Sequence, residues 1–319
     1  MTRGDGHGTL PRVTARPQPP PRWAWALRPT AYAIAIVLVL AVILAGCGGG
    51  SSRKPRARPR NPTTSGRSGT GSSTTPGTTT TTPAPPSPTT INSRCKPPPQ
   101  HPDPVLLLSG TYGVSWWALI GPQLAQLGYC VYTFSYGNDA TGDIVTSAKQ
   151  LATRVDRVLA ITGAGRVSIV GHSEGGMMPR YYIKFLGGAS KTADLVALAP
   201  SNHGTLNPVS FAGALAGCLA CAQQETGSSF LARLNAGDEA PPPVKYTVIE
   251  TKYDEVVIPY TSAFLNGPPA RVTNVTLQAQ CPRDFVGHIG ITTDPIALQW
   301  VENALASEGP ANPKFVPSC

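Results

Sequence analysis

Short apolar runs alternate with amphipathic stretches between residues 104 and 306. Val105 to Leu108 is an unbroken apolar run, which is typical of a strand buried on both faces of a sheet. Ile144 to Ile161 carries apolar residues on one face at helical spacing, which predicts an amphipathic helix. Strands that alternate with helices favour a mostly parallel sheet with helices on both faces. We therefore expect an α/β fold.

The remaining elements follow the same alternation. We expect strands over 129–136, 167–170, 195–199, 245–250 and 271–277, and helices over 116–127, 174–186 and 296–306. Pro122 is expected to kink the first of these helices. Ser201 to Pro243 is a long stretch rich in Gly, Ala and Ser between two strands, with enough apolar residues for short helices. These helices either cover a substrate site or pack as surface helices on the domain.

The first hundred residues differ in kind from the rest. An apolar run from Ala31 to Ile43 follows a basic, Pro-rich start and leads into Leu44-Ala45-Gly46-Cys47, which resembles the lipobox of bacterial lipoproteins. We expect residues 1–47 to be a lipoprotein-type signal peptide with Cys47 as the lipidated residue, anchoring the protein to the cell membrane through its N-terminus. An uncleaved signal anchor and ordinary secretion are the alternatives. All three place the rest of the chain outside the cytoplasm.

Residues 48–100 are mainly Gly, Ser, Thr, Pro and Arg, so they cannot bury a core and are predicted to be a disordered tether. Residues 101–319 then form one folded domain. The formal net charge of +9 belongs to the leader and the tether, because residues 1–100 carry 13 basic residues and 1 acidic residue. Residues 101–319 carry 13 basic and 16 acidic residues, which argues against a nucleic-acid partner.

A Gly-x-Ser-x-Gly pattern interrupts the chain where a strand gives way to a helix. It reads Gly171-His172-Ser173-Glu174-Gly175. Small residues two positions either side of a serine permit a strained turn that presents its hydroxyl, with a helix N-terminus beneath it. Ser173 is therefore the candidate nucleophile of a serine hydrolase.

A serine nucleophile needs a histidine base, and the chain order Ser, acid, His selects among five histidines. His288 leaves room for an acid before it and stands between small neighbours, so it is the expected base. His203 is the alternative, and it is otherwise a candidate for the substrate pocket or a brace for its loop. His172 adjoins Ser173 but should point away as a packing residue.

Asp254 is the expected acid, because it follows the end of the predicted strand 245–250 by four residues. Glu250 and Glu255 are its competitors, and either could be a surface charge. The oxyanion hole should come from the backbone N–H of Glu174 and of Thr111, where Gly110 lets the loop approach closely. Tyr112, next to Thr111, is a second candidate for the substrate pocket.

Together these residues resemble the class 2 bacterial lipases, a branch of the α/β-hydrolases. The resemblance rests on four motifs in the family's order: Gly-His-Ser-Glu-Gly-Gly-Met-Met-Pro-Arg-Tyr-Tyr at 171–182, Ala-Pro-Ser-Asn-His-Gly-Thr at 199–205, Thr-Lys-Tyr-Asp-Glu-Val-Val at 251–257 and Asp-Phe-Val-Gly-His at 284–288. It implies a carboxylic-ester hydrolase of lipase or esterase type with Ser173, Asp254 and His288 at the matching positions.

Two positions depart from the family pattern. Thr111 follows Ser109-Gly110 where many relatives have His-Gly. Glu174 stands where Gln or Met is commoner, and a carboxylate there would oppose an oxyanion unless it is turned outward or paired, for instance with an arginine.

Seven cysteines are present, and six remain once Cys47 is set aside. Six suit three disulfides in an oxidising compartment. Cys218 with Cys221, Cys281 with Cys319, and Cys95 with Cys130 are the expected pairs. A redox or metal role for the Cys-x-x-Cys motif is the alternative.

We therefore expect a secreted or surface-tethered monomer that hydrolyses acyl esters or lipids without a metal or organic cofactor. The alternatives are an acyltransferase that uses the same triad and a non-catalytic envelope-binding module of hydrolase fold.

Overall fold

The computed structural model describes residue 92, residues 94–115 and residues 117–319. Cys47, the predicted leader and nearly all of the predicted tether lie outside these described residues. Within the described ranges, no helix is both long enough and apolar enough to span a bilayer.

A six-stranded parallel sheet forms the centre of the described domain, with strand order β2-β1-β3-β4-β5-β6. The strands are β1 (Val105–Leu108), β2 (Val131–Phe134), β3 (Val167–His172), β4 (Thr192–Leu198), β5 (Lys245–Glu250) and β6 (Val272–Thr276). All their carboxyl ends therefore meet at one edge, where parallel sheets place ligand sites. The predicted α/β class is confirmed.

The β1 strand shows why this sheet is buried on both faces. Leu106 and Leu108 pack into one hydrophobic cluster, while Val105 and Leu107 pack into the other. Side chains alternate along a strand, so an unbroken apolar run supplies both faces at once.

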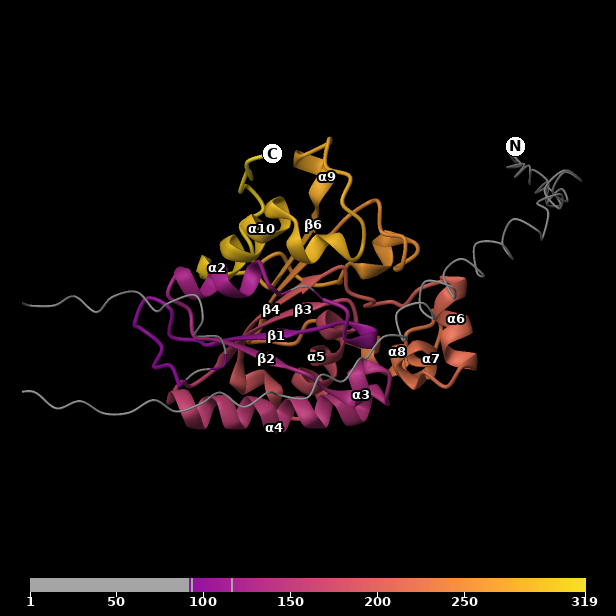
Figure 1. The fold of residues 1–319 in the computed structure, drawn as a ribbon, viewed down its shortest axis with the longest axis horizontal. Helices are drawn as coiled ribbons and strands as arrows, with labels where there is room; N and C mark the ends of the chain where they lie inside the picture. The colour runs from indigo at the N-terminus through magenta and orange to yellow at the C-terminus, as the bar shows by residue number, and fades with distance from the viewer. Residues whose placement is uncertain (1–91, 93, 116) are drawn as a thin grey trace, which may run out of the picture. The chain divides into compact units, whose positions relative to one another are not determined.

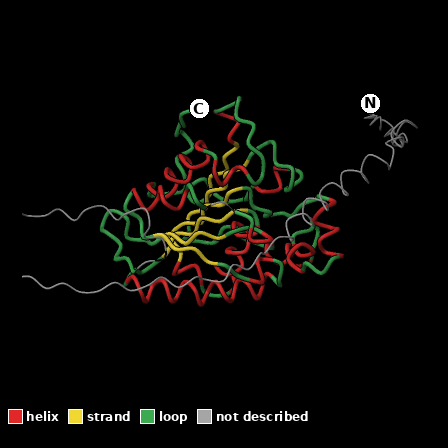
Figure 2. The backbone as a smooth tube through the Cα atoms, in the orientation of Figure 1, coloured by secondary structure: helices red, strands yellow, loops and turns green. Residues whose placement is uncertain are grey.

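Helices cover both faces of the sheet (Figure 1). The α4 helix (Ile144–Thr162) and α5 (Glu174–Phe185) lie on one face, while α2 (Ile120–Gln126) and α10 (Pro295–Ala306) lie on the other. Figure 2 shows the same layers, with red helices on either side of the yellow strands. Short elements complete the domain: α3 (Gly137–Ala140), α9 (Leu277–Gln280) and the 3-10 turns Thr111–Gly113, Gly188–Lys191, Tyr260–Ala263 and Gly290–Thr293.

The α4 helix matches its prediction closely because its ends carry strong signals. Asp143 caps its start by accepting a hydrogen bond from the Thr146 N–H at 2.9 Å. Gly163 ends it with a φ of 72°. The α2 helix differs, since it begins at Ile120. Pro122 therefore lies in its first turn, where the missing N–H breaks no helical hydrogen bond and no kink is required.

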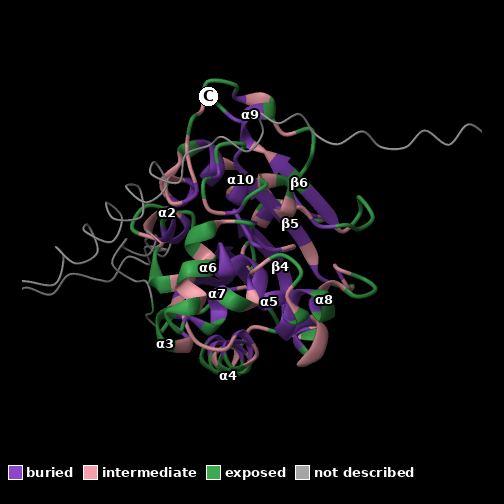
Figure 3. Cartoon of the chain, turned by 90° about the vertical axis from the view of Figure 1, so that its right-hand side faces the viewer, coloured by how far each residue is buried: buried purple, intermediate pink, exposed green. Residues whose placement is uncertain are grey.

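Three short helices form in the long stretch between β4 and β5: α6 (Pro208–Leu215), α7 (Leu219–Gln223) and α8 (Ser229–Asn235). The α8 helix packs on the domain through buried Phe230, Leu231 and Leu234. The α6 helix is different, because none of its residues is buried. Figure 3 shows its exposed and half-buried residues on the face turned toward the viewer.

Three disulfides join the expected pairs, Cys95–Cys130, Cys218–Cys221 and Cys281–Cys319. The Cys-x-x-Cys motif is therefore occupied by its own disulfide. The described residues also contain no group of three or more His, Cys, Asp or Glu side chains placed to hold a metal. Because Cys95 is tied to Cys130, a domain boundary at residue 101 would remove one partner of a disulfide.

Candidate active site

Ser173 occupies a strained turn between β3 and α5. Its φ of 56° and ψ of −122° are rare for a residue with a side chain. A Cβ on Gly171 would collide with the backbone oxygen of Gly175, and a Cβ on Gly175 would lie 2.5 Å from the Leu108 oxygen. These contacts explain the glycine spacing of the motif, since the turn fits against the backbone on both sides.

His288 and Asp254 are brought together from loops at the same sheet edge. His288 Nδ1 lies 2.7 Å from Asp254 Oδ2, and both side chains are buried. The other oxygen, Oδ1, accepts hydrogen bonds from the N–H groups of Val256 and Val257, each at 2.7 Å. Asp254 is thus held as an acceptor, and His288 presents Nε2 to the opposite side.

Neither competing carboxylate pairs with the His288 ring. Glu255 instead accepts a hydrogen bond from the His288 backbone N–H, at 3.0 Å. Glu250 is buried at the end of β5, where burial, with the nearby Asp254 carboxylate adding to it, raises its pKa well above the usual range. This shift favours the uncharged form of Glu250, whose Oε1 accepts a hydrogen bond from the Thr251 N–H.

His172 makes contacts through both of its ring nitrogens. Its Nε2 lies 2.9 Å from the His288 backbone oxygen, and its Nδ1 lies 2.9 Å from Ser115 Oγ. Burial lowers the pKa of His172 to about 3, with the neighbouring His288 acting in the same direction. The ring is therefore neutral, and it braces the loop that carries His288.

A cavity of about 340 Å³ opens over this site. Ser173 and His288 both line it, and within the described residues the Ser173 hydroxyl makes no hydrogen bond. The rest of the lining comes from the loops after β1 and β4, from the end of β3, from α6 and α7, and from the loops that carry Asp254 and His288: Gly110, Thr111, Tyr112, Val114, His172, Ser201, Thr205, Asn207, Val209, Ser210, Cys221, Gln224, Glu255, Val256, Val257 and Ile289. The stretch between β4 and β5 thus forms part of the cavity wall.

Two backbone N–H groups remain available beside Ser173. The N–H groups of Thr111 and Glu174 donate to no other described residue. Gly110 allows the Thr111 loop to approach, because a Cβ there would lie 2.8 Å from the Ser173 Cβ. These two N–H groups are the candidates for an oxyanion hole.

The sequence suggested that the Glu174 carboxyl would be turned outward or paired, for instance with an arginine. The structure shows neither arrangement. The carboxyl is fully buried, and its Oε2 accepts a hydrogen bond from Thr111 Oγ1 at 2.8 Å and from Gln224 Nε2 at 3.3 Å. Burial raises the pKa of Glu174 to about 8, and the hydrogen bond from Thr111 acts in the opposite direction. The side chain is therefore protonated at neutral pH and adds no negative charge to the site.

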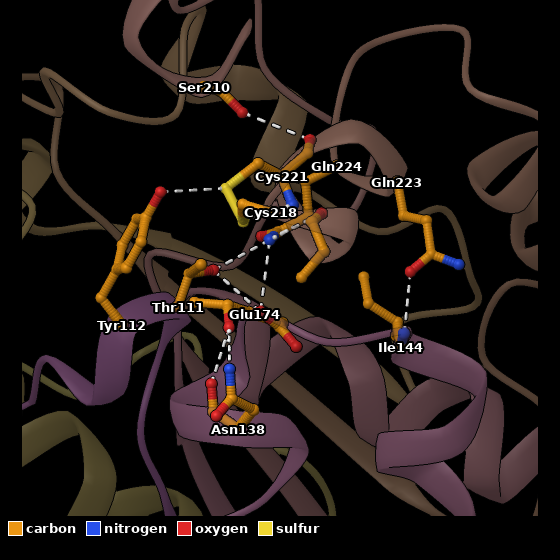
Figure 4. The surroundings of a disulfide bond; sticks show 12 residues. Thr111, Tyr112, Asn138, Ile144, Glu174, Ser210, Cys218, Cys221, Gln223 and Gln224 are labelled. Atoms are coloured by element: carbon orange, nitrogen blue, oxygen red, sulfur yellow. Dashed lines mark hydrogen bonds between the residues drawn. A yellow bond between two sulfur atoms is a disulfide. The ribbon is translucent and has the colours of Figure 1, made fainter. Parts of the chain in front are cut away.

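The two pocket candidates from the sequence are placed differently. Tyr112 lines the cavity, and its hydroxyl lies 3.5 Å from Cys221 Sγ (Figure 4). His203 lies outside the cavity lining and bonds to the Ser262 oxygen and to Glu239. It braces its loop, which was the other role expected of it.

Sequence reasoning did not identify Gln224 or Ser201 as part of the site. Gln224 Nε2 donates to Thr111 Oγ1 at 2.9 Å, and its Oε1 accepts from Ser201 Oγ at 2.7 Å. No motif marks a glutamine at the end of a short helix, so only the fold reveals this contact.

The parallel sheet, the strained serine turn and the order Ser173, Asp254, His288 define an α/β-hydrolase. The family model of lipase (class 2) matches residues 102–301, and the chain belongs to that family. The resemblance noted in the motifs is thereby confirmed.

Two curated relatives each match part of the chain. A triacylglycerol lipase of Vibrio cholerae serotype O1 is 33% identical over 107 residues, 32% of each protein. A triacylglycerol lipase of Pseudarthrobacter phenanthrenivorans is 35% identical over 86 residues, 24% of this chain and 27% of the relative. The matches therefore span about a third or less of these relatives.

Solved structures support the fold. Aspergillus fumigatus lipase B has a TM-score of 0.61 at 24% identity, covering 67% of this chain and 55% of that protein. The lipase BlEst2 of Bacillus licheniformis in its propeptide form has a TM-score of 0.51 at 16% identity, covering 72% of this chain and 54% of that protein.

Proposed function

We propose that this protein is a carboxylic-ester hydrolase of lipase or esterase type that works through a Ser173-Asp254-His288 triad. The observation that supports it most is the shared cavity, which is lined both by Ser173 and by a histidine bonded to a buried aspartate. Val209, Val256 and Ile289 give part of the cavity wall an apolar surface suited to an acyl chain. Membership of a lipase family and the two triacylglycerol lipases among its relatives support the same substrate class.

The reaction would follow the triad chemistry. Ser173 Oγ attacks the ester carbonyl carbon while His288 Nε2 takes its proton, and Asp254 stabilises the charged imidazole through Nδ1. The carbonyl oxygen becomes an oxyanion that accepts hydrogen bonds from the N–H groups of Thr111 and Glu174. His288 then returns the proton to the departing alcohol, leaving an acyl group on Ser173. Water, activated by His288, attacks this acyl-enzyme and releases the carboxylic acid.

The test is hydrolysis of p-nitrophenyl esters, from acetate to palmitate, by the full chain with its disulfides intact. We expect Ser173→Ala to lower kcat by at least about a thousandfold on every ester, because the nucleophile is lost. The chain-length profile of the unmodified protein separates an esterase from a lipase. Equal activity of the Ser173→Ala protein would refute the proposed mechanism, and transfer of the acyl group to an added alcohol in preference to water would reveal an acyltransferase.

We also propose that the protein is exported and anchored to the outer face of the membrane through a lipid on Cys47. Support comes from the Leu-Ala-Gly-Cys sequence after an apolar run and from three disulfides, which persist in oxidising compartments. We expect Cys47→Ser to move the protein from the membrane fraction into the medium or to leave its signal uncleaved. Mass spectrometry of the mature N-terminus distinguishes these states, and an unlipidated N-terminus in the unmodified protein would contradict the anchor.

A further inference from the structure

The Glu174 carboxyl group is buried beside the proposed nucleophile without a cationic partner. Its side chain has no exposed surface, and no ion pair in the described residues includes it. Oε2 accepts the hydrogen bonds from Thr111 and Gln224, whereas Oε1 has no hydrogen-bond partner. A carboxylate with one unpartnered oxygen in a dry interior is far more costly than the neutral acid.

The groups that face Glu174 do not stabilise a negative charge strongly. Tyr136 is the nearby titratable side chain, and its own hydroxyl donates to the Ser109 oxygen. The other titratable groups at the cavity are Tyr112, His172, His288 and Glu255. The hydrogen bonds from Thr111 and Gln224 favour the ionised form, and burial outweighs them. The environment therefore selects the protonated acid.

The same carboxyl joins three separate segments of the chain. Thr111 comes from the loop after β1, Gln224 from the end of α7, and Ser201, which bonds Gln224, from the loop after β4. Figure 4 shows Thr111, Glu174 and Gln224 converging beside the Cys218–Cys221 disulfide, and the Tyr112 hydroxyl lies next to the same disulfide. All of these segments contribute to the cavity wall.

We propose that Glu174 is a positioning residue that works as an uncharged carboxylic acid. It holds the loop that carries Thr111 and the end of α7 together over the cavity. This inference rests on the proposed function, because its effect is exerted on the oxyanion. Loss of the Oε1 proton to hydroxide yields a carboxylate and water. The carboxylate places a negative charge next to the Glu174 N–H, which is proposed to stabilise the negative charge of the oxyanion. The ionised enzyme then has a lower kcat.

Glu174→Gln and Glu174→Ala separate the two parts of this role. The amide keeps an oxygen acceptor for Thr111 and Gln224 but cannot ionise, whereas alanine removes the acceptor. We expect kcat of the unmodified protein to fall about fivefold or more between pH 7 and pH 9.5, and this fall to disappear in Glu174→Gln. Glu174→Ala should lose about tenfold or more in kcat at every pH, since the loop and α7 are no longer joined.

Thr111→Val gives a second measurement that does not depend on removing the carboxyl. Its lost hydroxyl donor should move the alkaline fall in kcat to higher pH, because that hydrogen bond favours ionisation. Glu308→Gln, at an exposed glutamate in the C-terminal segment, is the matched control and should leave the pH profile of the unmodified protein in place.

The pH profiles are measured by titrating the acid released from a short-chain ester, with thermal unfolding recorded for each variant. Activity that survives Ser173→Ala would reject the proposed function itself. If Ser173→Ala is inactive but Glu174→Gln keeps the alkaline fall, or is as impaired as a folded Glu174→Ala, the inference about Glu174 fails on its own. An alkaline fall that does not move in Thr111→Val would also overturn it.

Discussion

At the residue scale, two buried titratable residues, His172 and Glu174, flank Ser173 in the sequence. Their pKa values shift in opposite directions. Burial lowers the pKa of His172 to about 3 and raises that of Glu174 to about 8. Both shifts keep the side chain neutral, so the proposed nucleophile has two uncharged neighbours at neutral pH. The acidic side chains that contact His288 are then Asp254, at the ring, and Glu255, at the backbone N–H.

The His172 shift predicts a loss of stability in acid. Its folded pKa lies below the ordinary value of 6.5, so the unfolded chain binds the proton more readily. The free energy of unfolding should therefore fall as pH decreases from about 6.5 toward 3, by up to a few kcal/mol. We expect His172→Gln to lose less stability than the unmodified protein between pH 7 and pH 4, measured by thermal unfolding.

His203→Gln is the control for this measurement, because His203 is only half-buried and outside the cavity. It should not reduce the acid loss. An identical acid loss in His172→Gln and in the unmodified protein would contradict a neutral buried ring.

At the element scale, the α6 helix is unusual because it is apolar and exposed at once. Val209, Phe211 and Leu215 are 57%, 56% and 76% exposed, and residues 204–222 include no Asp, Glu, Lys or Arg. Val209 also lines the cavity, so this surface is continuous with the proposed site. Removing exposed apolar area of this kind from water lowers the free energy.

We expect the double variant Phe211→Ser and Leu215→Ser to lower activity on an emulsified long-chain triglyceride by about fivefold or more, because contact with the lipid surface is weakened. Hydrolysis of a dissolved short-chain ester should change much less. Val316→Ser, at an apolar side chain that is 74% exposed in the C-terminal segment, serves as the control. Equal losses on the emulsion and on the dissolved ester would argue against a lipid-contacting role for α6.

At the scale of the whole molecule, the sheet and its long helices could be predicted from the sequence. Val105 to Leu108 supplies both faces of a sheet, and α4 carries a cap at each end, so local signals and tertiary packing agree there. The chain order likewise predicted that the Asp254 and His288 side chains meet, and Ser173 lines the same cavity as His288. These features depend on short segments or on chain order.

The environment of Glu174 could not be predicted in the same way. Its carboxyl accepts a hydrogen bond from Gln224, which lies 50 positions away in a stretch without a motif. The role of His172 was underestimated for a related reason, since its partner is a backbone oxygen 116 positions away. Contacts that join distant segments through single side chains leave no periodic pattern, and only the folded chain shows them.

If Ser173 is a nucleophile activated by His288, its hydroxyl should react with a covalent label, and this reaction is the most direct test. The protein is treated with diethyl p-nitrophenyl phosphate, from which Ser173 Oγ would displace p-nitrophenolate to form a serine phosphate ester. Peptide mass spectrometry then locates the adduct. We expect a single adduct on Ser173, formed in step with the loss of ester hydrolysis and absent from folded Ser173→Ala and His288→Ala proteins. Hydrolysis that continues after Ser173 is fully labelled, or inactivation by an adduct on another residue, would contradict the account.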